Sequence, residues 1–211
     1  MPESALWLAV DLSSPVGSLS LHSNRNGDVQ TRAEVSLDDQ GKHSESVIPA
    51  VETLLNQAGV ALTDVDRFIV ASGPGSFTGL RVAYAALKAF SFALDKPIEA
   101  VDGHEARALG YLRENAGDEV TVSTLVAREK FLVSVFRRDG DAAVLVSEDL
   151  VTALPDAQVL LVDRQSPSGV FYPLRSSHLA LALAHARTRE SFSDWPSTAA
   201  ASPKYLGSRQ Y

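Results

Sequence analysis

The chain has 211 residues, of which 45% are hydrophobic and 21% are charged, and its formal net charge is -7. This composition is ordinary for a water-soluble globular protein of one or two domains. The acidity argues against a protein that holds nucleic acid alone by neutralising phosphates. The absence of cysteine excludes disulfides, thiolate metal sites and cysteine nucleophiles. No window has the apolar length of a membrane span and no basic segment precedes the first apolar run, so we expect a cytoplasmic protein with no membrane attachment.

The beginning of the chain is predicted to form a meander of three strands. Leu6–Val10 is a nearly continuous apolar run, typical of a central strand, and it ends at Asp11. Val16–His22 alternates as a strand does, with Val16, Ser18, Ser20 and His22 on one side and Leu19 and Leu21 on the other. Asn26-Gly27 suits a tight hairpin, so the chain is expected to return as a third strand along Val29–Val35.

The first predicted helix begins around residues 43–46 and ends before Gly59, a favourable residue just beyond a helix C-terminus. Pro49 lacks a backbone N–H and would break a helix interior. The sequence therefore predicts an N-cap at Ser46, or a kink if the helix starts at Ser44. Apolar residues at helical spacing form its predicted face: Val47, Ile48, Val51, Leu54, Leu55 and Ala58.

The stretch from Arg67 to Asp95 organises the rest of the chain. Arg67–Ser72 is rich in apolar residues and bounded by glycine, so it is predicted to be a buried strand. Gly73-Pro74-Gly75 forces a tight turn. Ser76 and Thr78 are both good N-cap candidates for the helix that follows.

This second helix is apolar almost all round, which predicts burial on more than one side. Its polar residues form only a thin seam: Arg81, Lys88 and Asp95. One face is rich in small side chains: Val82, Ala85, Ala86, Ala89, Phe90 and Ala93. Small residues allow close approach, so we expect another helix on this face, supplied by another molecule in a chain this short.

The second half repeats the same order more loosely. We expect strands at Pro97–Val101, Val120–Ala127, Phe131–Arg137, Ala143–Ser147 and Val159–Val162, helices at Gly103–Leu112 and Ser177–Arg187, and a tail from Ser191 that lies as a strap over the surface. The repetition predicts two related α/β lobes, residues 1–102 and 103–211, each with a mixed sheet flanked by helices.

The loop after the fourth strand is the candidate anion or nucleotide site, because a strand, a glycine turn and a helix N-terminus can direct free N–H groups at one spot. The residues concerned are Gly73, Pro74, Gly75, Ser76, Thr78 and Gly79. The P-loop lysine is absent, so we prefer a structural turn that lets neighbouring segments pack closely. Asp11 and Asp102 could form paired carboxylates for phosphate–magnesium chemistry, but carboxylates at strand ends are also common without that role.

Other catalytic constellations find little support. His43 and Glu45 could be a metal pair, but the position four residues after His43 is Val47, so the His-x-x-x-His pattern is missing. Ser76 is not in the Gly-x-Ser-x-Gly motif of serine hydrolases. We therefore predict no catalytic residues, no metal and no cofactor in this chain.

Several motifs resemble the bacterial TsaB family, also called YeaZ. The most specific is the run Ser72–Arg81, and the others are His43-Ser44-Glu45 followed by Ile48-Pro49, Lys96-Pro97, Val101–Ala106 and Pro203–Leu206. The resemblance implies two RNase H-like lobes of the actin-like, Hsp70-like ATPase superfamily. The sequence departs from the family pattern at three places: Leu12 follows Asp11, Val126 precedes Ala127-Arg128, and Gly207 follows Leu206. These departures weaken any nucleotide site in this chain.

The resemblance also implies a role as the non-catalytic partner of the TsaD transferase, which makes N6-threonylcarbamoyladenosine at position 37 of tRNAs. TsaD would hold ATP and metal, the ATPase TsaE would join the assembly, and tRNA would be bound only through the complex. Alone, the chain would be a homodimer through the surface that binds TsaD. That surface is expected to comprise His43, Ser44, Glu45, Val47, Ile48, Val51, Leu54, Leu55, Arg81, Val82, Ala85, Ala86, Ala89 and Ala93. The alternatives are a stand-alone ATP-dependent phosphotransferase, an M22-like peptidase of the same fold, or an interaction module unconnected with tRNA.

Overall fold

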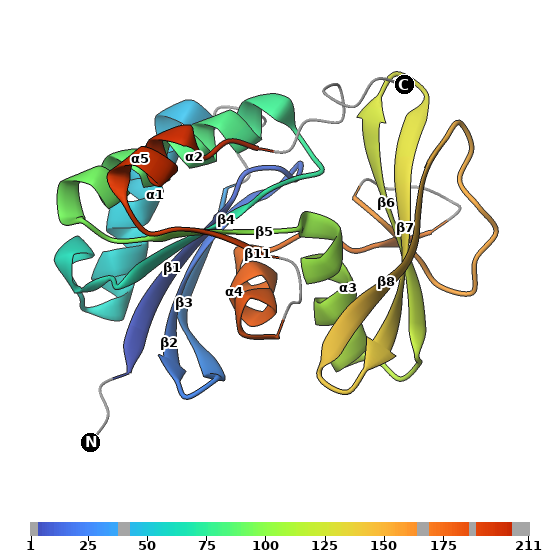
Figure 1. Cartoon of the computed structure of the whole chain (residues 1–211), viewed down its shortest axis with the longest axis horizontal. Coiled ribbons are helices and arrows are strands. Elements are labelled where there is room, and N and C mark those ends of the chain that lie inside the picture. Colours follow the sequence, from blue (N-terminus) through green and yellow to red (C-terminus); the bar gives the residue numbers. More distant parts are fainter. Residues whose placement is uncertain (1–3, 38–42, 164–168, 186–188, 204–211) are drawn as a thin grey trace.

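The computed structural model describes residues 4–37, 43–163, 169–185 and 189–203. They form two β-sheets, with strand orders β11-β5-β4-β1-β2-β3 and β10-β9-β6-β7-β8, and helices around them (Figure 1). Both sheets combine parallel and antiparallel pairs, which confirms the predicted class of two mixed-sheet α/β lobes.

The elements fall close to the predicted segments. The strands are β1 (Ala5–Asp11), β2 (Gly17–Arg25), β3 (Asp28–Leu37), β4 (Arg67–Ala71), β5 (Ile98–Val101), β6 (Glu119–Ala127), β7 (Lys130–Asp139), β8 (Ala142–Val151), β9 (Leu160–Val162), β10 (Val170–Phe171) and β11 (Arg189–Phe192). The helices are α1 (His43–Ala58), α2 (Phe77–Leu94), α3 (Gly103–Glu114), α4 (Ser176–His185) and α5 (Trp195–Ala200), with a 3-10 turn at Leu62–Asp64. Within the described ranges, no helix is long and apolar enough to cross a membrane.

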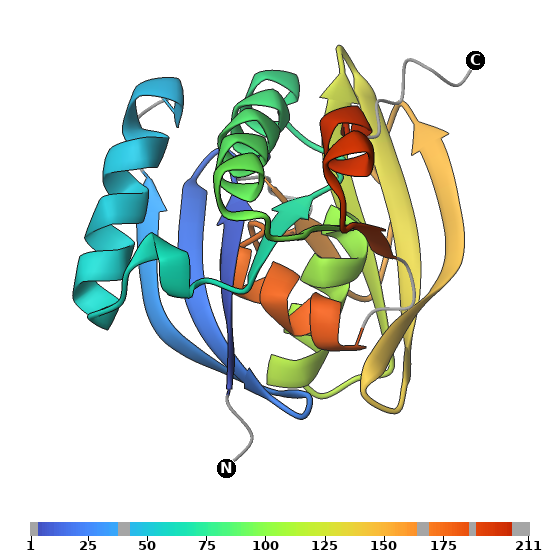
Figure 2. The ribbon, with the colours of Figure 1, turned by 60° about the vertical axis from the view of Figure 1, so that its left-hand side comes forward.

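The first sheet is covered on both faces. Successive residues of its central strand point in opposite directions, and they contribute to two different cores. Leu8 and Val10 of β1 belong to a core shared with α1 and α2, whereas Trp7 and Ala9 belong to a second core. Figure 2 shows α1 and α2 side by side on one face. The second core contains residues of α3, α4 and the second sheet, so it joins the two lobes.

The start of the first helix differs from the preferred prediction. Helix α1 begins at His43 and runs through Pro49, so the predicted N-cap at Ser46 is wrong. The carbonyl of Pro49 accepts a hydrogen bond from the hydroxyl of Thr53 at 2.9 Å. The α1 side chains that pack on the sheet stabilise the helix on both sides of the proline.

The C-terminal part of the chain returns to the first sheet. Strand β11 pairs antiparallel with β5, and the buried Glu99 of β5 accepts hydrogen bonds from Arg67 and, at 3.0 Å, from the hydroxyl of Ser191. Helix α5 then packs beside α2, where the Lys88 ammonium donates to the carbonyl of Ala199 at 2.7 Å. The described part of the predicted tail, residues 191–203, thus contains the end of β11 and helix α5. The division into lobes 1–102 and 103–211 stays a prediction. Residues 189–192, which it assigns to the second lobe, pair with β5 in the first sheet.

Candidate functional site

The loop between β4 and α2, the predicted anion or nucleotide loop, packs directly against the loop after β1. A Cβ on Gly79 would lie 1.7 Å from the carbonyl oxygen of Leu12, and one on Gly75 would lie 2.6 Å from the Cβ of Ser13. The Ser76 N–H donates to the Ser13 carbonyl at 2.8 Å, and the Gly79 N–H donates to the Ser76 hydroxyl at 3.2 Å. Ser76 is therefore the N-cap of α2, as predicted. These N–H groups are already bonded within the chain, so the geometry supports the structural turn rather than an anion cradle.

A small cavity lies at this loop. It has a volume of about 10 Å³ and is lined by Ser13, Ser14, Pro74, Gly75, Gly103, His104, Arg107, Thr124, Asp163 and Leu174. Such a volume holds about one water molecule. This cavity is therefore too small to hold a nucleotide.

Asp11 and Arg107 are charged residues buried near this cavity. One carboxylate oxygen of Asp11 accepts hydrogen bonds from the backbone N–H and the hydroxyl of Ser13, at 2.9 and 2.5 Å, and burial raises the Asp11 pKa. Arg107 donates to the carbonyls of Tyr172 and Ser123, each at 3.0 Å. Burial lowers the Arg107 pKa to about 10, while Asp163 and Asp11 act in the opposite direction. Asp11 is thus withdrawn from solvent, with one carboxylate oxygen bonded to Ser13.

Asp102, the other carboxylate considered for phosphate chemistry, caps helix α3. One of its oxygens accepts hydrogen bonds from the N–H groups of His104 and Glu105, at 2.9 and 3.0 Å. Burial raises the Asp102 pKa to about 6. The sequence signal for a reactive carboxylate is therefore accounted for by helix capping.

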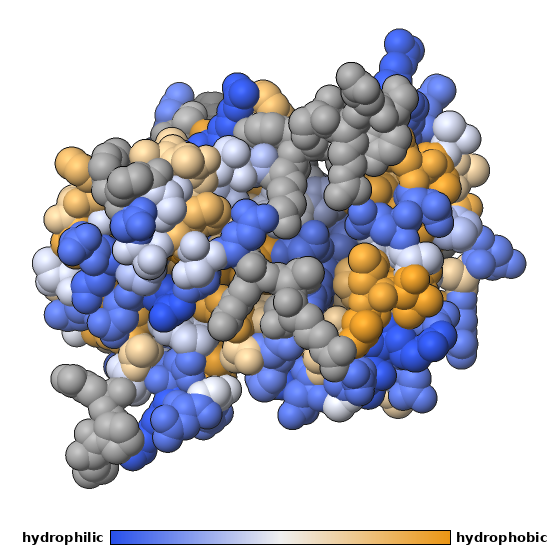
Figure 3. Space-filling model, viewed as in Figure 1, coloured by the Kyte–Doolittle hydropathy of each residue, from blue (hydrophilic) through white to orange (hydrophobic). Residues whose placement is uncertain are grey.

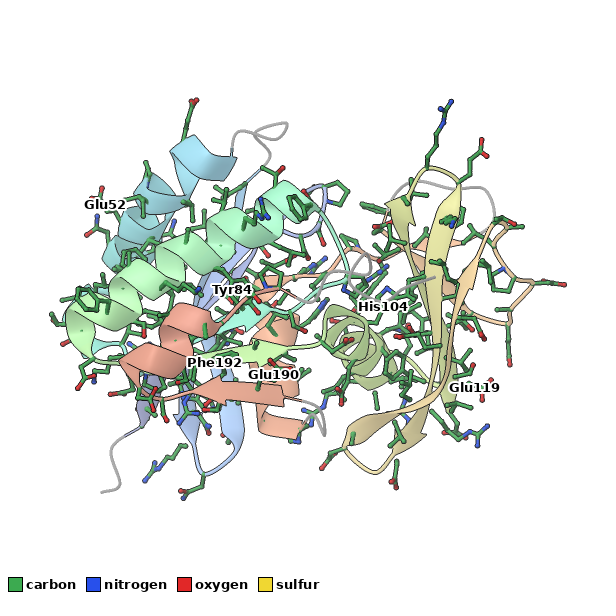
Figure 4. The ribbon with its side chains drawn as sticks, turned by 45° about the horizontal axis from the view of Figure 1, so that its top comes forward. Glu52, Tyr84, His104, Glu119, Glu190 and Phe192 are labelled. Atoms are coloured by element: carbon green, nitrogen blue, oxygen red, sulfur yellow. The ribbon has the colours of Figure 1, made fainter. Side chains whose placement is uncertain are left out.

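His104 joins α3 to the second sheet (Figure 4). Its Nδ1 lies 2.8 Å from the hydroxyl of Ser134 and its Nε2 lies 3.0 Å from the hydroxyl of Thr124. Burial lowers its pKa well below the usual value, so the ring is neutral at pH 7. In the part of the chain that the structure describes, no group of three His, Cys, Asp or Glu side chains could hold a metal ion. The side chains of His43 and Ser44 lie outside the described set.

The outward side of α1 and α2 is the candidate interaction surface. We define the α2 stripe as Phe77, Arg81, Ala85, Ala89, Phe92 and Ala93, all of which are exposed. The Arg81 guanidinium lies over the Phe77 ring, 3.9 Å from its centroid. Helix α1 adds Glu45 and Ile48, which are also exposed. Figure 3 shows apolar side chains among polar ones on this lobe.

Four predicted interface residues cannot belong to this surface. Val47, Val51, Leu54 and Leu55 are buried in the chain's own core, against the first sheet and α2. Their helical spacing marked the inward face of α1, which the sequence alone could not distinguish from a partner face. Val82 and Ala86 are half-buried at the edge of the same core.

The prediction also omitted two of the largest exposed side chains of α2. Phe77 is 49% exposed and Phe92 is 64% exposed. The sequence predicts burial for most of this helix, because it is apolar almost all round. Helix α5 packs beside α2, as Figure 2 shows, and the residues of the α2 stripe are exposed. The spacing of Phe77, Arg81, Ala85, Ala89 and Phe92 at three or four residues was the available signal, because such residues share one helix face.

Comparison with known families identifies one matching family model. The model, described as "TsaD: tRNA N6-adenosine threonylcarbamoyltransferase", matches residues 37–153. The tRNA threonylcarbamoyladenosine biosynthesis protein TsaB of Bacillus subtilis is 42% identical over 66 residues, which are 31% of this chain and 29% of that protein. The protein of the same name from Escherichia coli is 25% identical over 132 residues, which are 63% of this chain and 55% of that protein. The chain thus spans about half or less of the length of these curated relatives.

Two solved structures from Pseudomonas aeruginosa share the fold. One is described as similar to peptidase YEAZ and superposes with a TM-score of 0.74 at 25% identity, covering 96% of this chain and 99% of that one. The other, described as YeaZ, has a TM-score of 0.68 at 25% identity and covers 84% and 90% of the two chains. These similarities confirm the two-lobed fold that the sequence motifs implied.

Proposed function

Because the chain belongs to the TsaB (YeaZ) family, we propose that it is a subunit without catalytic residues that supports a TsaD-type transferase in the cytoplasm. The product would be N6-threonylcarbamoyladenosine at position 37 of tRNAs. A TsaE-type ATPase joins the same assembly, and tRNA is bound only through the complex. ATP and metal belong to the TsaD partner.

The observation that carries this proposal is the solvent exposure of the α2 stripe. Ala85 and Ala89 are exposed in the middle of a helix whose ends present Phe77 and Phe92. Small residues between two aromatic side chains allow a partner helix to approach the backbone closely while the rings bury apolar area. The stripe also suits a second copy of the chain, so a homodimer and the TsaD complex would compete for it.

The packing at the loop between β4 and α2 favours a supporting subunit over a stand-alone ATP-dependent phosphotransferase. The cavity there has room for about one water molecule, and Gly75 and Gly79 are closed off by the loop after β1. A peptidase of this fold would need metal ligands, and the described residues present no such cluster. Measurable ATP turnover by the isolated chain would favour the phosphotransferase instead.

The proposal is tested by co-purification with the TsaD of the same organism. Ala85→Glu and Ala89→Glu each place a charge on the stripe, and we expect each to weaken the complex by about 100-fold or more, since an unpaired buried charge is costly. The matched control is Ala127→Glu, at an exposed position of the second lobe. An intact complex in both stripe variants, with folding unchanged, would refute the proposed interface.

A further inference from the structure

The second sheet carries a groove that the proposed function does not use. One face of this sheet packs on α3, through Val120, Val122 and Phe136. On the opposite, outer face, the chain between β8 and β9 runs as a strap and leaves a cavity of about 420 Å³. Figure 4 shows Glu119, one of its lining residues, on the side away from α3. The lining residues are Glu119, Val120, Thr121, Val133, Val135, Ser147, Asp149, Val151 and residues 155–159.

The strand register explains the composition of the groove floor. Thr121, Val135 and Ser147 lie in one row across β6, β7 and β8, and Val133 faces Asp149 in the next row. Residues two apart on a strand point to the same face, so the two valines form an apolar centre. Hydroxyl groups border it on both sides, and Asp149 borders it on the β8 side.

The charge of the groove is one-sided. Glu119 has a partner, because its carboxylate accepts a hydrogen bond from Arg137 at 2.9 Å. Asp149 and Asp156 make no hydrogen bond or ion pair with the described residues, and both are exposed. Neither lysine nor arginine is among the described residues that line the cavity. The groove therefore combines an apolar floor with two uncompensated carboxylates.

We propose that this groove binds a linear aliphatic polyamine. The alkyl stems would cover Val133 and Val135, the ammonium groups would meet Asp149 and Asp156, and the hydroxyls of Thr121 and Ser147 would accept N–H donors. The volume falls within the range of roughly 300–1,000 Å³ usual for small-ligand sites. None of the described lining residues is aromatic, so none could stack with a planar ligand, and the negative charge of the groove disfavours an anion. Too few carboxylates converge among the described residues for a divalent metal.

The test is a titration of the whole chain with spermidine at low ionic strength. Calorimetry measures the affinity, and the methyl NMR signals of Val133 and Val135 report binding in the groove. We expect those signals to shift and the affinity to fall about tenfold in the double variant Asp149→Asn, Asp156→Asn. The control double variant Asp28→Asn, Glu52→Gln removes the same charge from the hairpin of the first sheet and from α1, away from the groove, and its affinity should stay within about twofold of the wild type.

Four outcomes would overturn the proposal. The first is equal weakening in both double variants, which would indicate a general charge effect. The second is spermidine binding without any change at the two valines. The third is binding of a lysine–valine peptide in the groove that spermidine cannot displace. The ligand of the groove would then be a polypeptide. Hexylamine, with one ammonium group, should bind more weakly than spermidine, and equal affinity would also count against the proposal.

Discussion

The α-carbon of Gly79 faces the carbonyl oxygen of Leu12 so closely that an added Cβ would lie 1.7 Å from that oxygen. This contact joins the first turn of α2 to the loop after β1. Gly79 belongs to the run Ser72–Arg81, the most specific motif of the sequence, and its role here is packing. Backbone atoms on both sides leave no flexible side chain that could move away. The glycine is therefore required by the fold itself.

Gly79→Ala should destabilise the chain by about 3 kcal/mol or more, because overpacking against backbone forces a segment to shift. Urea unfolding followed by circular dichroism measures the change. Thr78→Ala, at the exposed neighbouring position, is the control and should stay within about 0.5 kcal/mol of the wild type. A Gly79→Ala variant as stable as the control would show that the two loops can separate at little cost.

Val51→Ala should affect stability rather than partner binding. Val51 is buried in the core between α1 and the first sheet, so removing two methyl groups should cost about 2 kcal/mol. The affinity of the folded variant for TsaD should equal that of the wild type. Loss of affinity with full stability would instead place Val51 at the interface and contradict the buried arrangement.

Phe77→Ala and Phe92→Ala should show the opposite pattern. Both rings are about half exposed or more, so unfolding free energy should change little, whereas affinity for TsaD should fall about tenfold, as for aromatic anchors at interfaces. Surface plasmon resonance gives the affinities and thermal unfolding the stabilities. Phe171→Ala, 45% exposed on β10 of the second sheet, is the matched control. Equal affinities for all three variants would remove the aromatic anchors from the proposed interface.

Local signals predicted the segments that form elements. Alternation at residues 16–22, the hairpin at Asn26-Gly27 and the cap at Ser76 all act over a few residues, and all agree with the structure. The strand at residues 189–192 escaped prediction because its pairing with β5 and its contact with Glu99 lie about ninety residues away in sequence.

The candidate site was harder to predict for the same reason. A glycine turn before a helix has one sequence signature whether it holds an anion or a neighbouring loop. Only the approach of Leu12 and Ser13, more than sixty residues earlier, distinguishes the two. The apolar spacing of α1 likewise marks its buried face, and the position of the sheet decides that Val51 points inward while Ile48 points outward.

Asp102→Asn should change how stability depends on pH. Burial raises the Asp102 pKa from its usual value of 3.8 to about 6, so between these values the folded chain binds more protons at this residue than the unfolded chain. Stability from this group is therefore greatest in acid and falls as the pH rises from about 4 to about 6. Asparagine keeps the cap on α3 without a charge, so the variant should lose this decline and gain up to about 2 kcal/mol relative to the wild type at pH 7.

Urea unfolding from pH 4 to pH 7 measures this difference between the two proteins. The pKa of Asp11 is also raised by burial. Because Asp11 is present in both proteins, its own effect on stability cancels in the comparison. Asp28→Asn changes an exposed carboxylate in the hairpin of the first sheet and should follow the wild type. If the difference between Asp102→Asn and the wild type were constant across this pH range, the Asp102 carboxylate would titrate normally. It would then carry its charge at the lobe junction throughout the range, at no cost to folding.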